Sequence, residues 1–225
     1  MLHTLEILYE DNHIFVVTKP VGLLCQGDKS GSDNLLDLLK EHIKAKANKA
    51  GNVFLALVHR LDRNTGGVMV YAKTSKAAAR LSEQFREHSV TKTYLAAIEN
   101  ELNPPKGEMV DYLIKDGKVR KAFCVAEQTP HSKIAKLKYK TVGQIQKSKS
   151  KPPLYLIEVN LLTGRFHQIR AQFANRQLPL VGDTKYGSTL RLPAPALWAN
   201  QLSFDHPITK ERLQFTAKPP NNWPF

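Results

Sequence analysis

Residues 53–72 read VFLALVHRLDRNTGGVMVYA, and this stretch decides the fold class. Two apolar segments, Val53–Val58 and Val68–Ala72, flank the polar loop His59–Gly67. Short apolar runs bounded by Asn, Asp and Gly predict buried β-strands. The connection between them is too short for a helical crossover, so the sequence favours antiparallel neighbours in a sheet.

The flanking segments predict a further strand and two helices. Ile7–Lys19 reads as extended chain with an apolar strand at Ile14–Val17, which ends in a turn at Lys19, Pro20 and Gly22. Apolar residues spaced by three and four positions predict both helices. The first is expected to be capped by Ser32 or Asp33 and to bury Leu36, Leu39 and Ile43; the second is expected to be capped by Ser75 and to bury Ala78, Leu81 and Phe85.

Strand patterns dominate the second half of the chain. Thr91–Ile98 and Tyr155–Leu161 are predicted strands, and Ile134–Val142 alternates strictly between the two faces of a sheet. One face of Ile134–Val142 carries three basic residues, which we call the lysine comb: Lys136, Lys138 and Lys140. The other face carries Leu137, Tyr139 and Thr141.

A helix is predicted after Thr163-Gly164, with an apolar stripe of Phe166, Ile169 and Phe173. Because strands outnumber helices and most lie too close together for parallel crossovers, the predicted fold class is α+β. We expect a mixed, largely antiparallel central β-sheet flanked by helices. Neither linker-like stretch, 44–51 or 144–153, separates two self-sufficient segments, so we expect a single domain over residues 1–225.

The composition excludes several classes of protein. Of the 225 residues, 42% are hydrophobic and 24% are charged, which excludes disordered, collagen-like and disulfide-rich chains. Cys25 and Cys124 lie far apart without C-x-x-C spacing, which argues against a zinc site or a disulfide framework. Acidic residues stand where a signal peptide is basic, and the apolar runs are too short to cross a bilayer. We therefore expect a cytoplasmic protein that does not bind membranes.

The chain is strongly basic, with 33 Lys and Arg against 20 Asp and Glu, a net charge of +13 and a pI near 9.7. Residues 112–151 contain 11 basic and two acidic residues and so carry +9 of this charge. A block of one sign is typical of nucleic-acid binding, but a solvated lysine-rich surface has the same composition. Charge alone leaves these two interpretations open.

The loop His59–Gly67 is the densest polar cluster. Arg60 and Arg63 flank Asp62 and would hold its carboxylate ionised, as a catalytic role requires. The competing interpretation is an Asp that only caps its own turn.

A second polar cluster covers Thr163–Arg170. Gly164 supplies a turn, and Thr163 can cap the following helix, whose first N–H groups can bind a phosphate or a carboxylate. Arg165 in the first helical turn would oppose the helix dipole, so we expect a carboxylate near it. A plain surface arginine explains this position less well.

Several familiar chemistries lack their motifs. His-Arg-Leu-Asp differs in order from the kinase catalytic loop, and the chain has neither the kinase Gly-rich loop nor Asp-Phe-Gly. Walker A, Rossmann and His-Glu-x-x-His motifs are absent, and no second acid stands out for a glycosidase. The eight histidines lack ligand spacing, so we expect no metal site.

Six blocks in order carry a resemblance to a known family. They are Val16–Gly22 with Lys-Pro-x-Gly, His59–Gly67 with His-Arg-Leu-Asp-x-x-Thr-x-Gly, Lys92–Tyr94 with Lys-x-Tyr, Gly164–Arg170 with Gly-Arg-x-His-Gln-x-Arg, Val181–Gly187, and Leu202–Pro207. With these blocks the sequence resembles the RluA-type pseudouridine synthases over nearly the whole chain. Two departures stand out: Gly66 replaces the usual Ser, and we expect the frequent N-terminal S4-type RNA-binding domain to be missing.

The resemblance implies an enzyme that converts uridine in ribosomal or transfer RNA to pseudouridine without a metal or cofactor. It implies that Asp62 is the catalytic carboxylate, that Arg165 pairs with it, and that Tyr94 stacks on the uracil and relays the C5 proton. It implies an active site in a basic cleft, a flipped-out target base whose space Arg60 fills, and a monomer without an obligate protein partner. Further RNA contacts are expected at His59, Lys19, Arg170, Lys136, Lys138 and Lys140, and a pocket wall at Ile169 and Leu61.

Two other functions compete with this one. An RNA chaperone with incidental catalysis would bind RNA through the same basic surface and would not need Asp62. A basic enzyme that acts on another polyanion has no motif in its favour. At Ile169, core packing competes with the role in the pocket wall.

Overall fold

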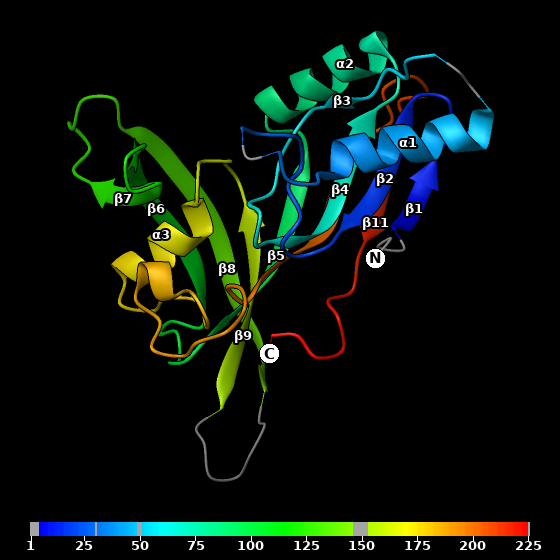
Figure 1. Ribbon diagram of the computed structural model, residues 1–225. Coiled ribbons are helices and arrows are strands. Elements are labelled where there is room, and N and C mark those ends of the chain that lie inside the picture. Colours follow the sequence, from blue (N-terminus) through cyan, green and yellow to red (C-terminus); the bar gives the residue numbers. More distant parts are fainter. Residues whose placement is uncertain (1–4, 30, 49–50, 146–152, 225) are drawn as a thin grey trace. The chain divides into compact units, whose positions relative to one another are not determined.

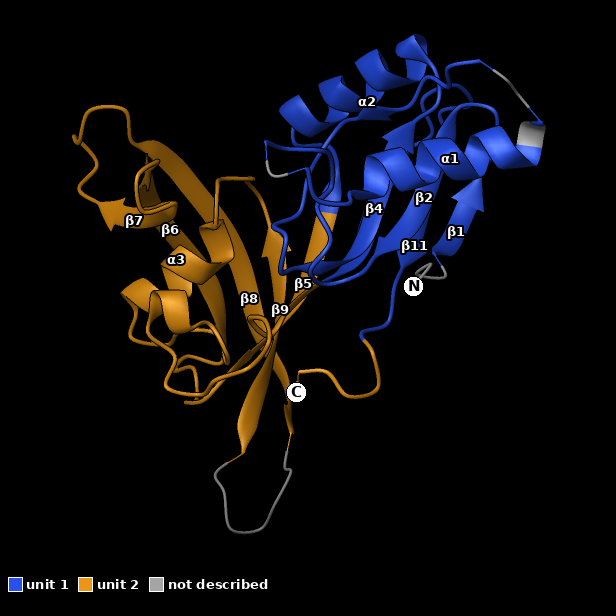
Figure 2. Cartoon of the chain, in the orientation of Figure 1, with its two compact units in different colours: residues 1–91, 199–219 blue, residues 92–198, 220–225 orange. Residues whose placement is uncertain are grey.

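The computed structural model describes residues 5–29, 31–48, 51–145 and 153–224 (Figure 1). Two compact units divide the chain: unit 1 comprises residues 1–91 and 199–219, and unit 2 comprises residues 92–198 and 220–225 (Figure 2). A single domain over the whole chain stays a prediction. Lys147, Lys149 and Lys151 of the basic block lie outside the described residues. None of the described helices is long and apolar enough to span a membrane.

Unit 1 contains the strand order β1-β2-β4-β10, with β3 also paired to β4 and β11 paired to β10. The pairs β1–β2, β2–β4, β3–β4 and β10–β11 are antiparallel. The bounds of its elements are β1 (Glu6–Glu10), β2 (Ile14–Lys19), α1 (Leu35–Ala47), β3 (Ala56–Leu57), β4 (Gly66–Ala72), α2 (Ser75–Arg86), β10 (Leu197–Asp205), which crosses the unit boundary, and β11 (Arg212–Thr216).

The core of unit 1 is built on β2 and β4. Ile14–Val17 and Val68–Ala72 are buried almost completely, which confirms both predicted strands and explains why they read as continuous apolar runs. The two helices add Leu35, Leu39, Ile43, Ala77 and Leu81 to the buried set.

The predicted helix caps are wrong by one or two positions. Asn34, in extended conformation, caps α1 by accepting the N–H of Asp37, and Thr74 caps α2 by accepting the N–H of Ala77. The predicted apolar faces are confirmed in part, because Leu39, Ile43 and Leu81 are buried. The helices bury Leu35 rather than Leu36 and Ala77 rather than Ala78, and Phe85 is half-buried.

The strand predicted at residues 53–58 is much shorter than expected. Only Ala56–Leu57 pairs with β4, opposite Ala72 and Tyr71. Leu55 is buried, but Phe54 is 52% exposed. Further along β4, the N–H of Val70 donates to the side chain of His59 at 3.1 Å instead of to a strand partner.

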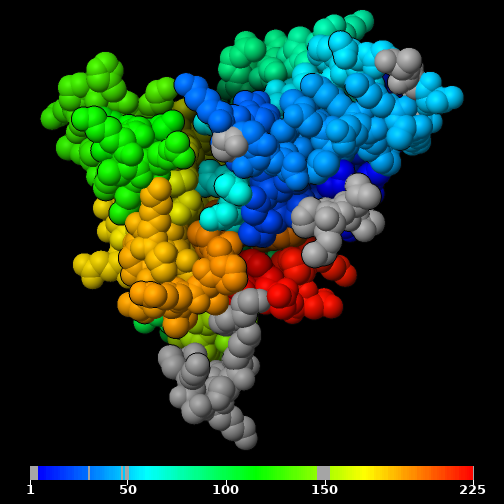
Figure 3. Space-filling view, viewed as in Figure 1, coloured from blue at the N-terminus to red at the C-terminus, as the bar shows by residue number. Residues whose placement is uncertain are grey.

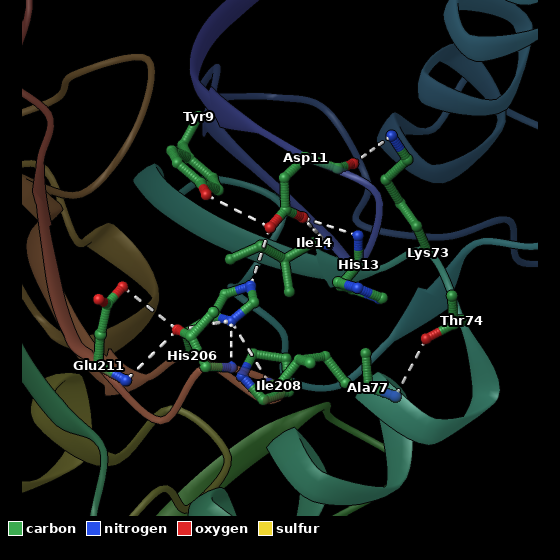
Figure 4. A network of polar contacts seen from close by, with 12 residues as sticks. Tyr9, Asp11, His13, Ile14, Lys73, Thr74, Ala77, His206, Ile208 and Glu211 are labelled. Carbon is green, nitrogen blue, oxygen red and sulfur yellow. Dashed lines mark hydrogen bonds and ion pairs between the residues drawn. The ribbon is translucent and has the colours of Figure 1, made fainter.

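A polar network ties the β10–β11 region to the β1–β2 turn (Figure 4). His206 Nδ1 accepts the N–H groups of Ile208 and Thr209, so Nε2 carries the proton and donates to Asp11 at 2.9 Å. Burial raises the pKa of Asp11, but the N–H groups of Ile14 and His13 and the contact with His206 outweigh burial and lower it overall. The motif residue His206 is thus part of the unit 1 framework.

Unit 2 contains the strand order β5-β9-β8-β6-β7, and each adjacent pair is antiparallel. The bounds of its elements are β5 (Thr91–Ile98), β6 (Lys106–Asp116), β7 (Lys121–Val125), β8 (Lys133–Ile145), β9 (Leu154–Leu161), α3 (Gln168–Asn175) and the 3-10 turn η1 (Thr184–Tyr186). The predicted strand Thr91–Ile98 is confirmed at both ends.

The predicted alternation in β8 is confirmed. Ala135 and Leu137 are fully buried, whereas Lys138 and Lys140 are exposed. Helix α3 packs on the buried face, where the rings of Tyr139 and Phe173 lie 6.4 Å apart. The α+β class with a largely antiparallel sheet and flanking helices is therefore confirmed.

Candidate active site

Asp62 is half-buried in a tight turn of unit 1 between β3 and β4. The Asp62 carbonyl accepts the N–H of Thr65 at 3.0 Å, which closes the turn. Next to Asp62, the N–H of Gly22 donates to the Arg63 carbonyl, and the Arg63 Nε donates to the Gly22 carbonyl, both at 2.9 Å. The Lys-Pro-x-Gly segment thus holds the backbone on the C-terminal side of Asp62.

Cys25 holds the other side of the same turn. Its buried thiol donates to the Leu61 carbonyl at 3.1 Å and accepts the Leu61 N–H at 3.3 Å. Burial raises the pKa of this thiol, so it stays protonated and able to donate. The backbone is therefore anchored immediately before and after Asp62.

Lys19 is fully buried beneath this turn. Its ammonium donates to the carbonyls of Leu23, Pro20 and Arg63 at 2.7, 2.9 and 3.1 Å. Burial lowers the pKa of Lys19 to about 8, and the nearby Asp62 opposes that shift. Because all three donors of the ammonium are used, Lys19 acts in the fold as a clamp on the Asp62 turn.

The residues that flank Asp62 have different surroundings. Arg60 is exposed, and Leu61 is 8% exposed. His59 Nε2 accepts the N–H of Val70, and its ring stacks on Phe85 with centroids 4.6 Å apart. These contacts give His59 a role in the fold, and its predicted contact with RNA stays a prediction.

Gly67, at the start of β4, must be a glycine. It has φ of +122°, and a Cβ there would stand 2.1 Å from the Ala199 carbonyl oxygen. No side chain fits such a close approach of two backbones. The final glycine of the motif is therefore explained by packing in unit 1.

In unit 2, the Arg165 segment differs from the prediction. Helix α3 begins at Gln168, so Arg165 precedes the helix and does not oppose its dipole as predicted. Thr163 is not the cap; its hydroxyl donates to Gln168 Oε1 at 2.7 Å, and Gln168 Oε1 also accepts the Arg165 N–H. The Arg165 Nε donates to the Ile134 carbonyl at 2.9 Å. A buried glutamine thus organises this segment.

Arg170 is buried in an ion pair that the sequence did not predict. Its Nε and one terminal nitrogen donate to the two carboxylate oxygens of Asp183 at 2.7 and 2.8 Å. Asp183 is only 1% exposed. The fork of Arg170 is therefore engaged with Asp183, and a direct RNA contact at Arg170 stays a prediction. Ile169, at 4% exposure, lies in the core as the competing interpretation expected.

Tyr94 and Lys92 lie on β5 of unit 2. Tyr94 is 9% exposed, and Lys92 Nζ lies 3.8 Å from the position of a Cβ on Gly164. Burial, followed by the neighbouring Arg165, lowers the pKa of Lys92 to about 8. Lys92 was missed as a candidate, although it stands in the Lys-x-Tyr block. Together, Lys92 on β5 and Arg165 before α3 would attract an anionic group.

The lysine comb lies on the exposed face of β8, but part of its charge is neutralised. Lys140 forms an ion pair with Glu158 at 3.0 Å, and Lys138 stands opposite Glu108 in the β6–β8 pairing. Lys136 is half-buried. Phosphate binding by the comb stays a prediction.

Across the described ranges, no three or more His, Cys, Asp or Glu residues lie together as a metal site requires. The expectation of a reaction without metal or cofactor stays a prediction.

Comparison with solved structures defines the class of fold. The chain is similar to the human RNA pseudouridylate synthase domain containing 4, with a TM-score of 0.78 and 24% identity over 96% of this chain and 89% of that one. It is also similar to the protein named human RNA pseudouridylate synthase domain containing 1, with a TM-score of 0.76 and 22% identity over 96% of this chain and 84% of that one. The fold is therefore that of a pseudouridine synthase domain.

Comparison of sequences defines the family. The RNA pseudouridylate synthase family model matches residues 13–175. The ribosomal large subunit pseudouridine synthase D of Zymomonas mobilis is 31% identical over 97% of this chain and 70% of its own length. The tRNA pseudouridine synthase C of Vibrio parahaemolyticus is 31% identical over 97% and 92%. The chain belongs to the RNA pseudouridylate synthase family, which confirms the RluA-type resemblance and identifies an isomerase.

Proposed function

We propose that this protein isomerises uridine to pseudouridine in ribosomal or transfer RNA and that Asp62 is its catalytic carboxylate. The observation that carries the proposal is the anchoring of the Asp62 turn. Hydrogen bonds on both sides of Asp62 and the buried Lys19 clamp hold its backbone while its side chain stays half-buried. Such preorganisation is what a reacting group needs and what a simple turn cap does not.

The reaction breaks the bond between N1 of uracil and C1′ and then joins C5 to C1′. The proton on C5 is lost and N1 gains one, so atoms balance without an oxidant or a second substrate. Asp62 assists cleavage or attacks the sugar, and either role needs its ionised form. The positive charge of Lys19 interacts with the Asp62 carboxylate and favours its ionised form.

Arg165 and Tyr94 are the other proposed catalytic groups. Arg165 offers a guanidinium on a segment fixed by Gln168 and by the Ile134 carbonyl. Such a cation favours ionisation of a carboxylate partner. Tyr94 offers a largely buried ring for stacking on uracil and a hydroxyl for the C5 proton. Lys92 is proposed to add to the positive potential around Arg165.

The target base must leave its helix before it reacts, which costs a few kcal/mol. The exposed side chain of Arg60 is proposed to fill the space that the base leaves. Binding of RNA by basic side chains would offset the energy of flipping.

Replacement of the proposed catalytic carboxylate tests the function. Asp62→Asn removes the charge with little change in volume and should lower the rate of tritium release from C5-labelled uridine RNA by about 10³-fold or more. The matched control is Asp33→Asn, an exposed carboxylate in the same unit, which should keep the wild-type rate.

Tritium release by Asp62→Asn at the wild-type rate would overturn the proposed mechanism. The binding-only alternative makes a different prediction, because a chaperone would still rescue a deletion phenotype with Asp62→Asn. A map of pseudouridine positions in wild-type and deletion cells then identifies the RNA and the uridine.

A further inference from the structure

Strand register divides the unit 2 sheet into two faces. Tyr94 on β5 pairs with Val159 on β9, which in turn pairs with Tyr139 on β8. Directly paired residues point to the same side of a sheet, and the Tyr139 ring lies 6.4 Å from the ring of Phe173 in α3. We call this side the α3 face; it carries Tyr94, Val159 and Tyr139. The proposed catalytic tyrosine thus lies on the face against which α3 packs.

Lys115 on β6 lies on the same α3 face. Gly107 pairs with Tyr139, and Lys115 follows Gly107 by an even number of positions along one continuous strand. Because side chains alternate between the two faces of a sheet, both positions point to the same side. Lys106 of the same strand and Lys138 of the lysine comb point to the opposite side. A cation that binds RNA around the proposed catalytic tyrosine is therefore expected at Lys115.

Lys115 also lies next to the segment that carries Arg165. The Lys115 Nζ lies 4.8 Å from the centroid of the Phe166 ring, and Phe166 follows Arg165 directly in the chain. The Arg165 Nε donates to the carbonyl of Ile134, which pairs with Tyr112 in the same strand as Lys115. Lys115 thus adds a positive charge beside the segment of a proposed catalytic group.

Phe166 is held in a fixed position by its neighbours. Its ring stacks on His167, with centroids 3.9 Å apart and planes at 18°. His167 Nδ1 lies 3.0 Å from the hydroxyl of Tyr186, and this hydroxyl accepts the N–H of Ala122 at 2.8 Å. A cation over an aromatic ring is attracted to it, so the Lys115 side chain is partly ordered before a ligand arrives. It therefore loses less entropy when it binds that ligand.

The surroundings of Lys115 are positively charged. Burial, followed by Arg170, Lys185 and Lys115, lowers the pKa of His167 to about 3. Arg170 is paired with Asp183, but Lys115 and Lys185 are exposed. In the described ranges of the chain, no carboxylate forms an ion pair with Lys115. In Figure 3 the β6–β7 hairpin (green) adjoins the region of η1 (orange), and this surface would attract a polyanion.

We propose that Lys115 is an RNA-binding residue of this enzyme, whose ammonium, held over Phe166, binds a backbone phosphate near the target uridine. The proposal rests on the proposed function, which brings RNA to Tyr94 and Arg165. A lysine binds phosphate as a point charge, and a phosphate contact positions RNA without selecting a base. Lys115 is therefore a residue for the binding of substrate rather than for the chemical step.

The kinetic test compares two lysines on the same strand that point to opposite faces. RNA purified from deletion cells grown with C5-tritiated uridine is the substrate, because its target uridines are unmodified. Lys115→Gln should raise KM for tritium release about three- to fivefold and leave kcat within about twofold of the wild type. Lys115→Arg keeps the charge and should behave like the wild type. The matched control Lys106→Gln removes the same charge from the opposite face and should change neither constant.

Three outcomes overturn the proposal. One is a wild-type KM in Lys115→Gln, and another is an equal rise of KM in Lys106→Gln. The third is a fall of kcat in Lys115→Gln at an unchanged KM, because it would place Lys115 in the chemical step or in the fold.

The contact with phosphate is tested separately by the salt dependence of binding, with fluorescein-labelled oligouridylate as the probe. Loss of one phosphate contact in Lys115→Gln should reduce the slope of log affinity against log salt by about 0.7. Lys106→Gln should keep the wild-type slope. A wild-type slope in Lys115→Gln would contradict a phosphate contact.

The role of the Phe166 ring is tested by a double-mutant cycle. Phe166→Leu should raise KM less than Lys115→Gln does, and Phe166→Tyr, which keeps a flat ring, should behave like the wild type. The double variant Phe166→Leu with Lys115→Gln should have the KM of Lys115→Gln alone, because the ring acts only through the lysine. Additive effects on KM would show that Phe166 does not position Lys115.

The outcomes separate this proposal from the proposed function. If the wild-type protein releases no tritium but Lys115→Gln reduces the salt slope, the proposed function fails and the phosphate contact stands. If the wild-type protein releases tritium and Lys115→Gln matches it in KM and in salt slope, only the phosphate contact fails.

Discussion

The turn of Asp62 in unit 1 and the segment of Arg165 in unit 2 are anchored by different chemistry. The first is held by main-chain carbonyls that surround one buried cation, Lys19. The second is held by the amide of Gln168 and lies beside a buried ion pair, Arg170 with Asp183. The partners of Lys19 are neutral carbonyl dipoles, whereas the partner of Arg170 is the negatively charged carboxylate of Asp183.

This difference predicts unequal costs when each cation is removed. Loss of Lys19 would remove one donor from each of three neutral carbonyls, whereas loss of Arg170 would leave a carboxylate buried without its bidentate partner. A buried ion that lacks a partner is the more expensive of the two.

The largest effect is expected from Arg170→Met. It should lower the free energy of unfolding by about 3–5 kcal/mol, because the Asp183 carboxylate, 1% exposed, loses its bidentate partner. Urea denaturation measures the change. The double variant Arg170→Met with Asp183→Leu should recover much of the loss, since it buries no charge; a double variant as unstable as the single one would contradict this explanation.

A smaller effect is expected from Lys19→Met. The loss of three hydrogen bonds to buried or half-buried carbonyls should destabilise unit 1 by about 2–3 kcal/mol, measured in the same way. Because the Arg63 carbonyl keeps the N–H of Gly22, the turn should persist in part, and kcat should fall more than KM rises. An unchanged kcat would show that the clamp does not position Asp62.

The smallest effect concerns pH. Burial lowers the pKa of Lys19 to about 8 from 10.5, so between these pH values the unfolded chain binds the extra proton and stability should rise with pH. The rise should be about 1.4 kcal/mol for each pH unit within this window and should be missing from Lys19→Met. The measurement is the urea midpoint of the wild type and of Lys19→Met as a function of pH. The difference between the two curves isolates Lys19, because Cys and Tyr titrate in both proteins. Parallel curves would contradict the assignment.

The comparison also shows where reasoning from sequence succeeded. Strong local patterns gave three correct predictions: the strand Thr91–Ile98, the buried run Val68–Ala72, and the alternation around Leu137 and Lys138. These depend on side-chain periodicity, which is written in consecutive residues. The caps failed because several adjacent residues of α1 could cap it, and only the backbone conformation selects Asn34.

The predictions for the candidate site were also partly right and partly wrong. Sequence motifs alone brought Asp62, Tyr94 and Arg165 forward, and the family comparison confirmed the activity to which these motifs point. The role of Asp183 as the partner of Arg170 was not predicted, because an ion pair between distant residues leaves no periodic signal. The helix-dipole argument for Arg165 was wrong, because α3 starts at Gln168.

The sequence by itself determined several of the strands, the fold class and the family, because residue spacing and short motifs are local properties of the chain. Only the tertiary structure decided what each charged residue of those motifs does. Lys19, Arg170 and Lys140 look alike in a sequence, yet one binds carbonyls in the core, one a buried carboxylate and one a surface carboxylate. The physical reason is that burial and partners set the energy of a charge, and both arise only when distant segments pack together.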